Sequence, residues 1–194
     1  MMHYWPFIFV YTLLGCGAKQ MTTRLVHDVP TLTCDVPLVM RSAAGGLNQW
    51  CETTDGVLSG AFIEYLPNLV RTVDGTYEAG KRHGIWREWH PNGERKVDGM
   101  YQENRRIKVW RWWTMDGTVF QEGEYVDGQE YGIWTTYWPT GRKQSEGRYR
   151  MGERTGVWTE WHPNGQRAAE GPYVDGAKDT AQWTFWDAAG RKQQ

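Results

Sequence analysis

The 194-residue sequence is poor in several features that would assign a function directly. It has only three cysteines, a formal net charge of −1, and no cluster of lysines and arginines. Because the basic residues are dispersed, the footprint needed for nucleic-acid binding is missing, and we expect no nucleic-acid partner. No GxSxG, HExxH or P-loop motif is present, so the sequence argues against an enzyme, a bound metal and a cofactor.

The N-terminal apolar run, Trp5 to Leu14, is shorter than the ~20 residues that a membrane-spanning helix needs. Its length is typical of the central region of a signal peptide. The following Leu13-Leu14-Gly15-Cys16 resembles a bacterial lipobox. That resemblance implies a signal peptide over residues 1–15, a lipid on Cys16 that attaches the protein to a membrane, and export to the cell envelope. The same resemblance implies the outer membrane, because Gly17 follows the cysteine. If the start or the signal is misread, the protein is cytoplasmic.

Lipidation of Cys16 would leave Cys34 and Cys51 as the remaining thiols. An exported compartment is oxidising enough to pair them, so we favour a disulfide over the alternative of two buried free thiols. Two cysteines without further ligand spacing do not make a four-ligand metal site.

Aromatic residues and glycine are abundant, with 13 Trp, 10 Tyr and 23 Gly, and Trp and Tyr favour strands. Shifting the sequence by 24 residues aligns it with itself in the pattern GxYxxGxxxGxWxxWxxxG. The recurring residues are Gly75, Gly99, Gly123, Gly147 and Gly171; Tyr77, Tyr101, Tyr125, Tyr149 and Tyr173; Trp86, Trp110, Trp134 and Trp158; and Trp89, Trp113, Tyr137 and Trp161. These are expected to be structural residues of the repeat.

The repeat predicts an all-β protein, an elongated antiparallel meander of about six units with two strands each. The units are 51–74, 75–98, 99–122, 123–146, 147–170 and 171–194. The first is degenerate and the last carries one extra residue, as expected for terminal repeats with a single neighbour. Turn signals such as Pro91-Asn92-Gly93 and Asp127-Gly128 separate the strands, predicting strands over residues 94–102 and 108–114. Residues 16–50 lack the repeat phase and are expected to be a linker or cap.

The pattern resembles the MORN repeat in its bacterial variant form. The resemblance implies scaffolding, membrane-proximal assembly or partner binding, and many bacterial members carry an antitoxin label.

Two readings of the aromatic columns stay open. The rings stack as the core of a single-layer sheet, or one column forms an exposed groove for a partner. Trp86 and Trp89 lie on opposite faces of a regular strand, unless a bulge at Gly84 realigns them. Trp112 and Trp138 depart from the columns and are therefore the candidate partner-binding residues.

Acidic and histidine columns have simpler interpretations. Asp74, Asp98, Glu122, Glu146 and Glu170 precede the phase glycine, mostly with Arg or Lys three residues earlier, which predicts surface ion pairs. His90 and His162 share one repeat position three units apart and cannot ligate one metal.

These observations favour a non-catalytic, lipid-anchored exported scaffold that binds another protein or a glycan. The alternatives are an antitoxin-like inhibitor of a toxin and a cell-wall or choline-type glycan-binding module.

Overall fold

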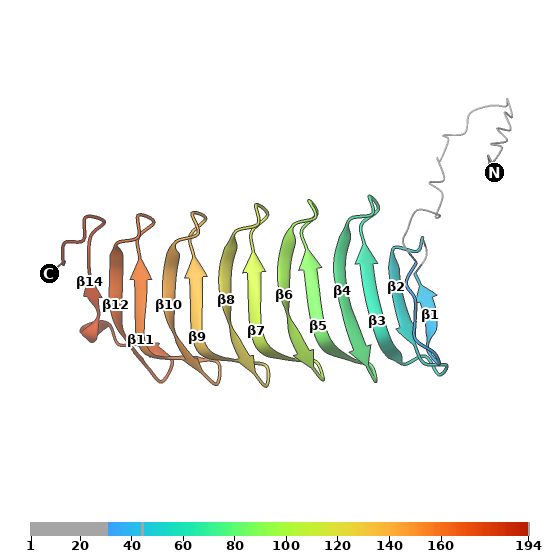
Figure 1. Cartoon of the computed structure of the whole chain (residues 1–194). Helices are drawn as coiled ribbons and strands as arrows, with labels where there is room; N and C mark the ends of the chain where they lie inside the picture. Colours follow the sequence, from blue (N-terminus) through green and yellow to red (C-terminus); the bar gives the residue numbers. More distant parts are fainter. Residues whose placement is uncertain (1–30, 44, 194) are drawn as a thin grey trace, which may run out of the picture.

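The computed structural model describes residues 31–43 and 45–193, which form one open antiparallel β-sheet of 14 strands (Figure 1). The strands are β1 (Val39–Ser42), β2 (Asn48–Glu52), β3 (Leu58–Tyr65), β4 (Arg71–Glu78), β5 (Lys81–Trp89), β6 (Arg95–Gln102), β7 (Arg105–Trp113), β8 (Val119–Val126), β9 (Gln129–Tyr137), β10 (Lys143–Arg150), β11 (Glu153–Trp161), β12 (Arg167–Val174), β13 (Ala177–Lys178) and β14 (Thr184–Phe185). A short 3₁₀ turn, η2 (Thr180–Gln182), separates the last two. No helix in these described ranges is long and apolar enough to cross a membrane.

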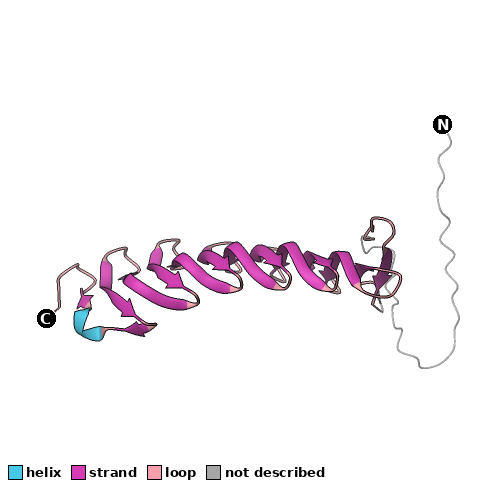
Figure 2. Cartoon of the chain, turned by 90° about the horizontal axis from the view of Figure 1, so that it is seen from below, coloured by secondary structure: helices cyan, strands magenta, loops and turns pink. Residues whose placement is uncertain are grey.

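The sheet is a meander, because β1 to β13 lie side by side in chain order and β14 pairs with β12. This confirms the all-β, elongated fold expected from the repeat, and Figure 2 shows the ribbon as one extended layer. The meander begins at Val39, before residue 51, because β1 and β2 join it without the repeat's glycine and tryptophan. The two observed strands β6 and β7 cover Arg95–Gln102 and Arg105–Trp113, so the second begins three residues before the predicted start at 108.

Two kinds of turn alternate along the chain, and each long edge of the sheet carries only one kind. Along the lower edge in Figure 1, two-residue turns join strand pairs, and both turn residues have positive φ. Ala79 and Gly80 have φ of 46° and 78°, and Asp127 and Gly128 have 51° and 85°. Paired positive φ values are those of type I′ turns, whose twist matches that of the flanking strands. Along the upper edge, five-residue turns are closed by backbone bonds such as His90 N–H to the Glu94 carbonyl, 2.8 Å.

A bulge recurs in the first strand of each regular hairpin. Across β4 and β5, Asp74 pairs with Arg87 but Thr76 pairs with His83, so β5 has two extra residues at Gly84, whose φ is 68°. Beyond the bulge the pairing with β6 is regular from Trp86 to Glu88. Trp86 and Trp89 therefore point to opposite faces, even though the bulge considered from the sequence is present.

Candidate binding surface

One face of the sheet, here called the aromatic face, carries the first tryptophan column and the tyrosine column. The indoles of Trp86, Trp110, Trp134 and Trp158 are 2–5% exposed. Each is flanked by tyrosines edge-on, as in Tyr125 to Trp134 with centroids 5.1 Å apart and an interplanar angle of 90°. Such pairs contribute about 0.5–1.5 kcal/mol each beyond burial. This column is the core of the molecule.

The phase glycines lie directly beneath these indoles. A Cβ built on Gly99, Gly123 or Gly147 would lie 2.1 Å from an indole carbon of the next strand. The indole N–H then donates to a backbone carbonyl, as from Trp134 to Glu124 at 3.1 Å. Glycine and tryptophan recur together because the ring occupies the space that a side chain would take.

Arginines cover the edge of the aromatic column. Arg106 lies 4.8 Å from the Trp110 ring centroid and 5.4 Å from that of Tyr125, and it donates to the Tyr125 hydroxyl at 3.2 Å. Burial opposes the charge of Arg106, but hydrogen bonds to the hydroxyls of Tyr101 and Tyr125 outweigh it, and its pKa lies above the ordinary value. The same position holds Arg82, Arg154 and Lys178 in other units, and Glu130 in the middle one. These basic side chains therefore help to hold the aromatic column together.

The opposite face, here called the ionic face, carries the second aromatic column and the acidic column. Arg71 pairs with Asp74 at 3.0 Å and lies 5.6 Å from the Trp89 ring centroid. Across strands, Arg111 Nε donates to Glu122 at 2.7 Å. The other acidic residues pair three residues back, as the spacing predicts, in Arg95–Asp98, Lys143–Glu146 and Arg167–Glu170. Pairs this exposed contribute about 0.2–1 kcal/mol each.

A row of aliphatic side chains also points away from the aromatic core. Ile85, Val109, Ile133 and Val157 are 48%, 51%, 50% and 61% exposed. They recur every 24 residues and face the same side as the ionic pairs. On the strands between, exposed Glu124 and Arg148 pair with Val109 and Ile133, so the row is a series of apolar side chains interrupted by charged ones.

The two tryptophans expected to contact a partner are both partly buried. Trp112 lies on the aromatic face, with its ring 6.0 Å from Trp110 and 5.8 Å from Trp134. Trp138 occupies the histidine position of the repeat and donates from Nε1 to the Trp161 carbonyl at 2.9 Å. His90 makes the equivalent bond to the Trp113 carbonyl at 2.8 Å. The structure thus places Trp112 in the core column and Trp138 in a bond between neighbouring units.

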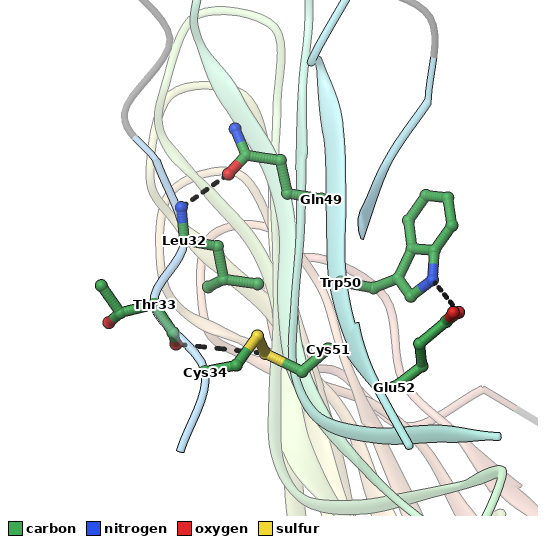
Figure 3. The surroundings of a disulfide bond; sticks show 7 residues. All are labelled: Leu32, Thr33, Cys34, Gln49, Trp50, Cys51 and Glu52. Atoms are coloured by element: carbon green, nitrogen blue, oxygen red, sulfur yellow. Dashed lines mark hydrogen bonds between the residues drawn. A yellow bond between two sulfur atoms is a disulfide. The ribbon is translucent and has the colours of Figure 1, made fainter. Parts of the chain in front are cut away.

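The N-terminal end of the ribbon is held by a disulfide between Cys34 and Cys51, whose Cα atoms are 5.7 Å apart. Figure 3 shows the segment before β1 lying along β2, where the Leu32 N–H donates to Gln49 Oε1 at 2.6 Å. Cys51 is 1% exposed. Cys16 and the expected signal peptide lie outside the described residues. Within those residues, no group of His, Cys, Asp and Glu side chains could hold a metal ion.

A cavity of about 180 Å³ opens on the aromatic face in the first regular units. Its walls include Phe62, Trp86 and Trp110, with the carboxylates of Glu64 and Glu88. Glu88 pairs with Lys96 at 2.9 Å. Sequence reasoning missed these glutamates and the covering arginines, although the same 24-residue shift aligns the basic positions.

These features define a class: an open, single-layer β-repeat protein whose aromatic and charged side chains contact one another in columns. Within that class, the family model of the MORN repeat variant matches residues 82–103 and 154–175. Those two segments correspond to the hairpins β5–β6 and β11–β12. No curated protein matches the chain.

Among solved structures, a crystal structure of TarM is similar at 12% identity and a TM-score of 0.34, over 56% of this chain and 21% of that chain. A S. aureus TarM mutant in complex with Fondaparinux, alpha-GlcNAc-glycerol and UDP gives 12% identity and a TM-score of 0.35 over the same shares. This chain therefore spans about a fifth of the TarM chain.

Proposed function

We propose that this protein is a non-catalytic repeat scaffold, exported and anchored to the cell envelope through a lipid on Cys16, that presents its sheet to a protein or glycan partner. The observation that carries the proposal is the mutual engagement of its polar side chains. Arginines bind tyrosine hydroxyls, as Arg82 binds Tyr101 at 3.1 Å, acids bind neighbouring bases, and His90 binds a carbonyl. Groups held this way give a surface a fixed shape and charge, as a binding scaffold requires.

Two further features support this location and role. The Cys34–Cys51 disulfide fits an oxidising, exported compartment. The exposed aliphatic row and the cavity on the opposite face give a partner two distinct surfaces, and a ribbon without covering helices in its described part leaves both accessible.

The anchoring is tested by feeding cells labelled palmitate. We expect label on the wild type and none on Cys16→Ser, which should leave the membrane fraction. Equal fractionation of the two proteins would show that the lipid anchor is absent.

The scaffold role is tested by a pull-down from native envelope with the anchored protein, followed by identification of bound proteins and by a glycan array with the same protein. We expect a specific protein or glycan to be retained. The control is the same envelope extract passed over beads that carry no protein. Failure to retain any partner above that background would contradict the proposal.

A further inference from the structure

The cavity on the aromatic face lies where a ring is missing from the tryptophan column. Between Trp110 and Trp134 the column is completed by Trp112, whose ring contacts both at 6.0 and 5.8 Å. One unit earlier the position equivalent to Trp112 is Glu88, and two units earlier it is Glu64. The space between Trp86 and Trp110 is therefore left open to a flat group of similar size.

The carboxylates of this cavity give it a charge preference. Glu64 pairs across the strands with Val73, and Val73 with Glu88, so the two glutamates flank one valine on the same face. Their Cα atoms lie two strand spacings apart, about 9.6 Å, which a single forked cation can bridge. In the described part of the chain, the partly buried Glu64 carboxylate has no hydrogen bond or ion pair, unlike Glu88.

A contact between the last two units shows how the protein satisfies the same position internally. Glu160, equivalent to Glu64 and Glu88, is bound by Lys178 at 3.4 Å. Lys178 also lies 3.5 Å from the Trp183 ring centroid, so one cation serves both a carboxylate and an indole. In the first regular unit the equivalent cation, Arg82, also covers an indole, 4.9 Å from the Trp86 ring centroid, but its hydrogen bond goes to the Tyr101 hydroxyl at 3.1 Å and not to Glu64. The cation that would complete the Glu64 site therefore has to come from outside.

We propose that this cavity binds an arginine side chain presented by a protein partner. The proposal rests on the scaffold function and names the chemistry of its partner. A guanidinium is planar, so it fits the ring-sized space between Trp86 and Trp110, and its five N–H donors reach carboxylates on two sides. A lysine has the charge but not the flat, forked group. Arg82, which lines the same cavity and covers Trp86, repels a second cation, so the charged tip is directed away from it to Glu64.

The test uses the full chain and three small probes: the amides of N-acetyl-arginine, N-acetyl-citrulline and N-acetyl-phenylalanine. Citrulline has nearly the shape of arginine without its charge. Binding is followed by NMR through the indole N–H signals. We expect arginine to shift the Trp86 and Trp110 signals, with citrulline and phenylalanine at least about tenfold weaker, the scale of one lost charge-assisted hydrogen bond. Equal binding of citrulline, tighter binding of phenylalanine, or no binding of arginine overturns the proposal.

Two variants and one control locate the site. Glu64→Gln keeps the size of the side chain and should weaken arginine binding about tenfold. Glu88→Trp should abolish it by building the ring that Trp112 supplies one unit later. Glu160→Gln, at the same repeat position outside the cavity, should bind like the wild type. If Glu88→Trp does not fold, Glu64→Gln alone tests the site. Arginine binding by Glu64→Gln equal to that of the wild type would refute it.

The pull-down separates this site from the scaffold role. If Glu64→Gln retains a protein partner as well as Glu160→Gln does, the arginine site is wrong and the scaffold stands. If the arginine probe binds but the anchored protein retains no partner, the site stands and the scaffold role fails. A partner that is a glycan also overturns the arginine assignment.

Discussion

Glycine is required at some repeat positions because an aromatic ring packs directly on the backbone there. Gly123 has an ordinary backbone conformation, and it is required because the Trp134 indole fills the position of its Cβ. Gly93, by contrast, has no heavy atom within 4 Å of a built Cβ but has a φ of 87°. Glycine thus recurs in the repeat for two separate physical reasons, contact at one position and backbone conformation at the other.

The two reasons predict different costs for the same substitution. Gly123→Ala forces the buried Trp134 ring to move and should lower the free energy of unfolding by about 3 kcal/mol, as overpacking of a core does. Gly93→Ala meets only the left-handed backbone penalty of about 1–2 kcal/mol. Urea denaturation of both variants measures the difference. Equal losses would show that the indole does not rest on Gly123.

Titration of Tyr137 gives a second prediction at this scale. Burial, and then its hydrogen bond to Glu122, raises the pKa of Tyr137 to about 12. A pKa above the unfolded value of about 10 means that the neutral phenol stabilises the fold fully below that pH. The contribution is lost as the pH rises from about 10 to about 12. We expect Tyr137→Phe to lose less stability than the wild type over this range in urea denaturation, and parallel curves would contradict the assignment.

Glu122 titrates at the acidic end of the same contact. Hydrogen bonds from Arg111 and then from Tyr137 hold its pKa below the ordinary value. Its contribution is therefore present above the unfolded pKa of a glutamate and is lost as the pH falls through the lower folded pKa. The Arg111, Glu122 and Tyr137 side chains come from β7, β8 and β9, so this one contact links three consecutive strands.

At the scale of the hairpin, neighbouring units are joined at their five-residue turns. His90 and His162 bind the Trp113 and Trp186 carbonyls, and Asn92 and Asn164 bind the Met115 and Ala188 carbonyls at 2.6 Å. Trp138 makes the same bond with a different ring. The turns thus link each hairpin to the next, in addition to the strand pairing.

This equivalence predicts that Trp138 is replaceable by histidine. Trp138→His should change stability by no more than about 1 kcal/mol, because the ring nitrogen still reaches the Trp161 carbonyl. Trp138→Ala should cost about 2 kcal/mol from the lost bond and the lost burial of a partly exposed ring. Thermal denaturation of the two variants compares them. A larger loss in Trp138→His than in Trp138→Ala would contradict the shared role.

Sequence reasoning reaches the hairpin and its turns but not every side chain. Glycine marks both kinds of turn, because it accepts the positive φ that Gly93 has in a five-residue turn and Gly128 in a two-residue turn. The even spacing of Trp110 and Trp112 places both on one face, a signal that was available. The absence of a partner for Glu64 among the described residues could not be predicted from the sequence. It depends on whether Arg82 hydrogen-bonds to a tyrosine hydroxyl or to a carboxylate, and the repeat pattern does not determine this. β1 and β2 were also out of reach, because backbone pairing needs no repeat motif.

Across the whole molecule, each long strand contacts only its neighbours, so stability is close to a sum over units. Removing residues 123–146 deletes one complete 24-residue repeat. It joins Glu122 to Gly147, which occupies the same repeat position as the deleted Gly123. We expect this shortened chain to remain folded, with a lower melting temperature and with the same β-sheet circular dichroism spectrum as the full chain. Removing 123–134 instead deletes about one strand and reverses the direction of all that follow, and should aggregate. Unfolding of the 24-residue deletion would show that the units are not interchangeable.

The two ends of the ribbon differ from its middle in strand length. β1 has 4 residues, β2 has 5, and β13 and β14 have 2 each, against 8 or 9 in the strands from β3 to β12. An open sheet made of alike hairpins offers its terminal strands to any other copy, which is the route to fibres. Short, irregular terminal strands give a second molecule too few backbone groups to pair with. We therefore expect the ends of the sheet to resist backbone pairing with a second copy of the chain.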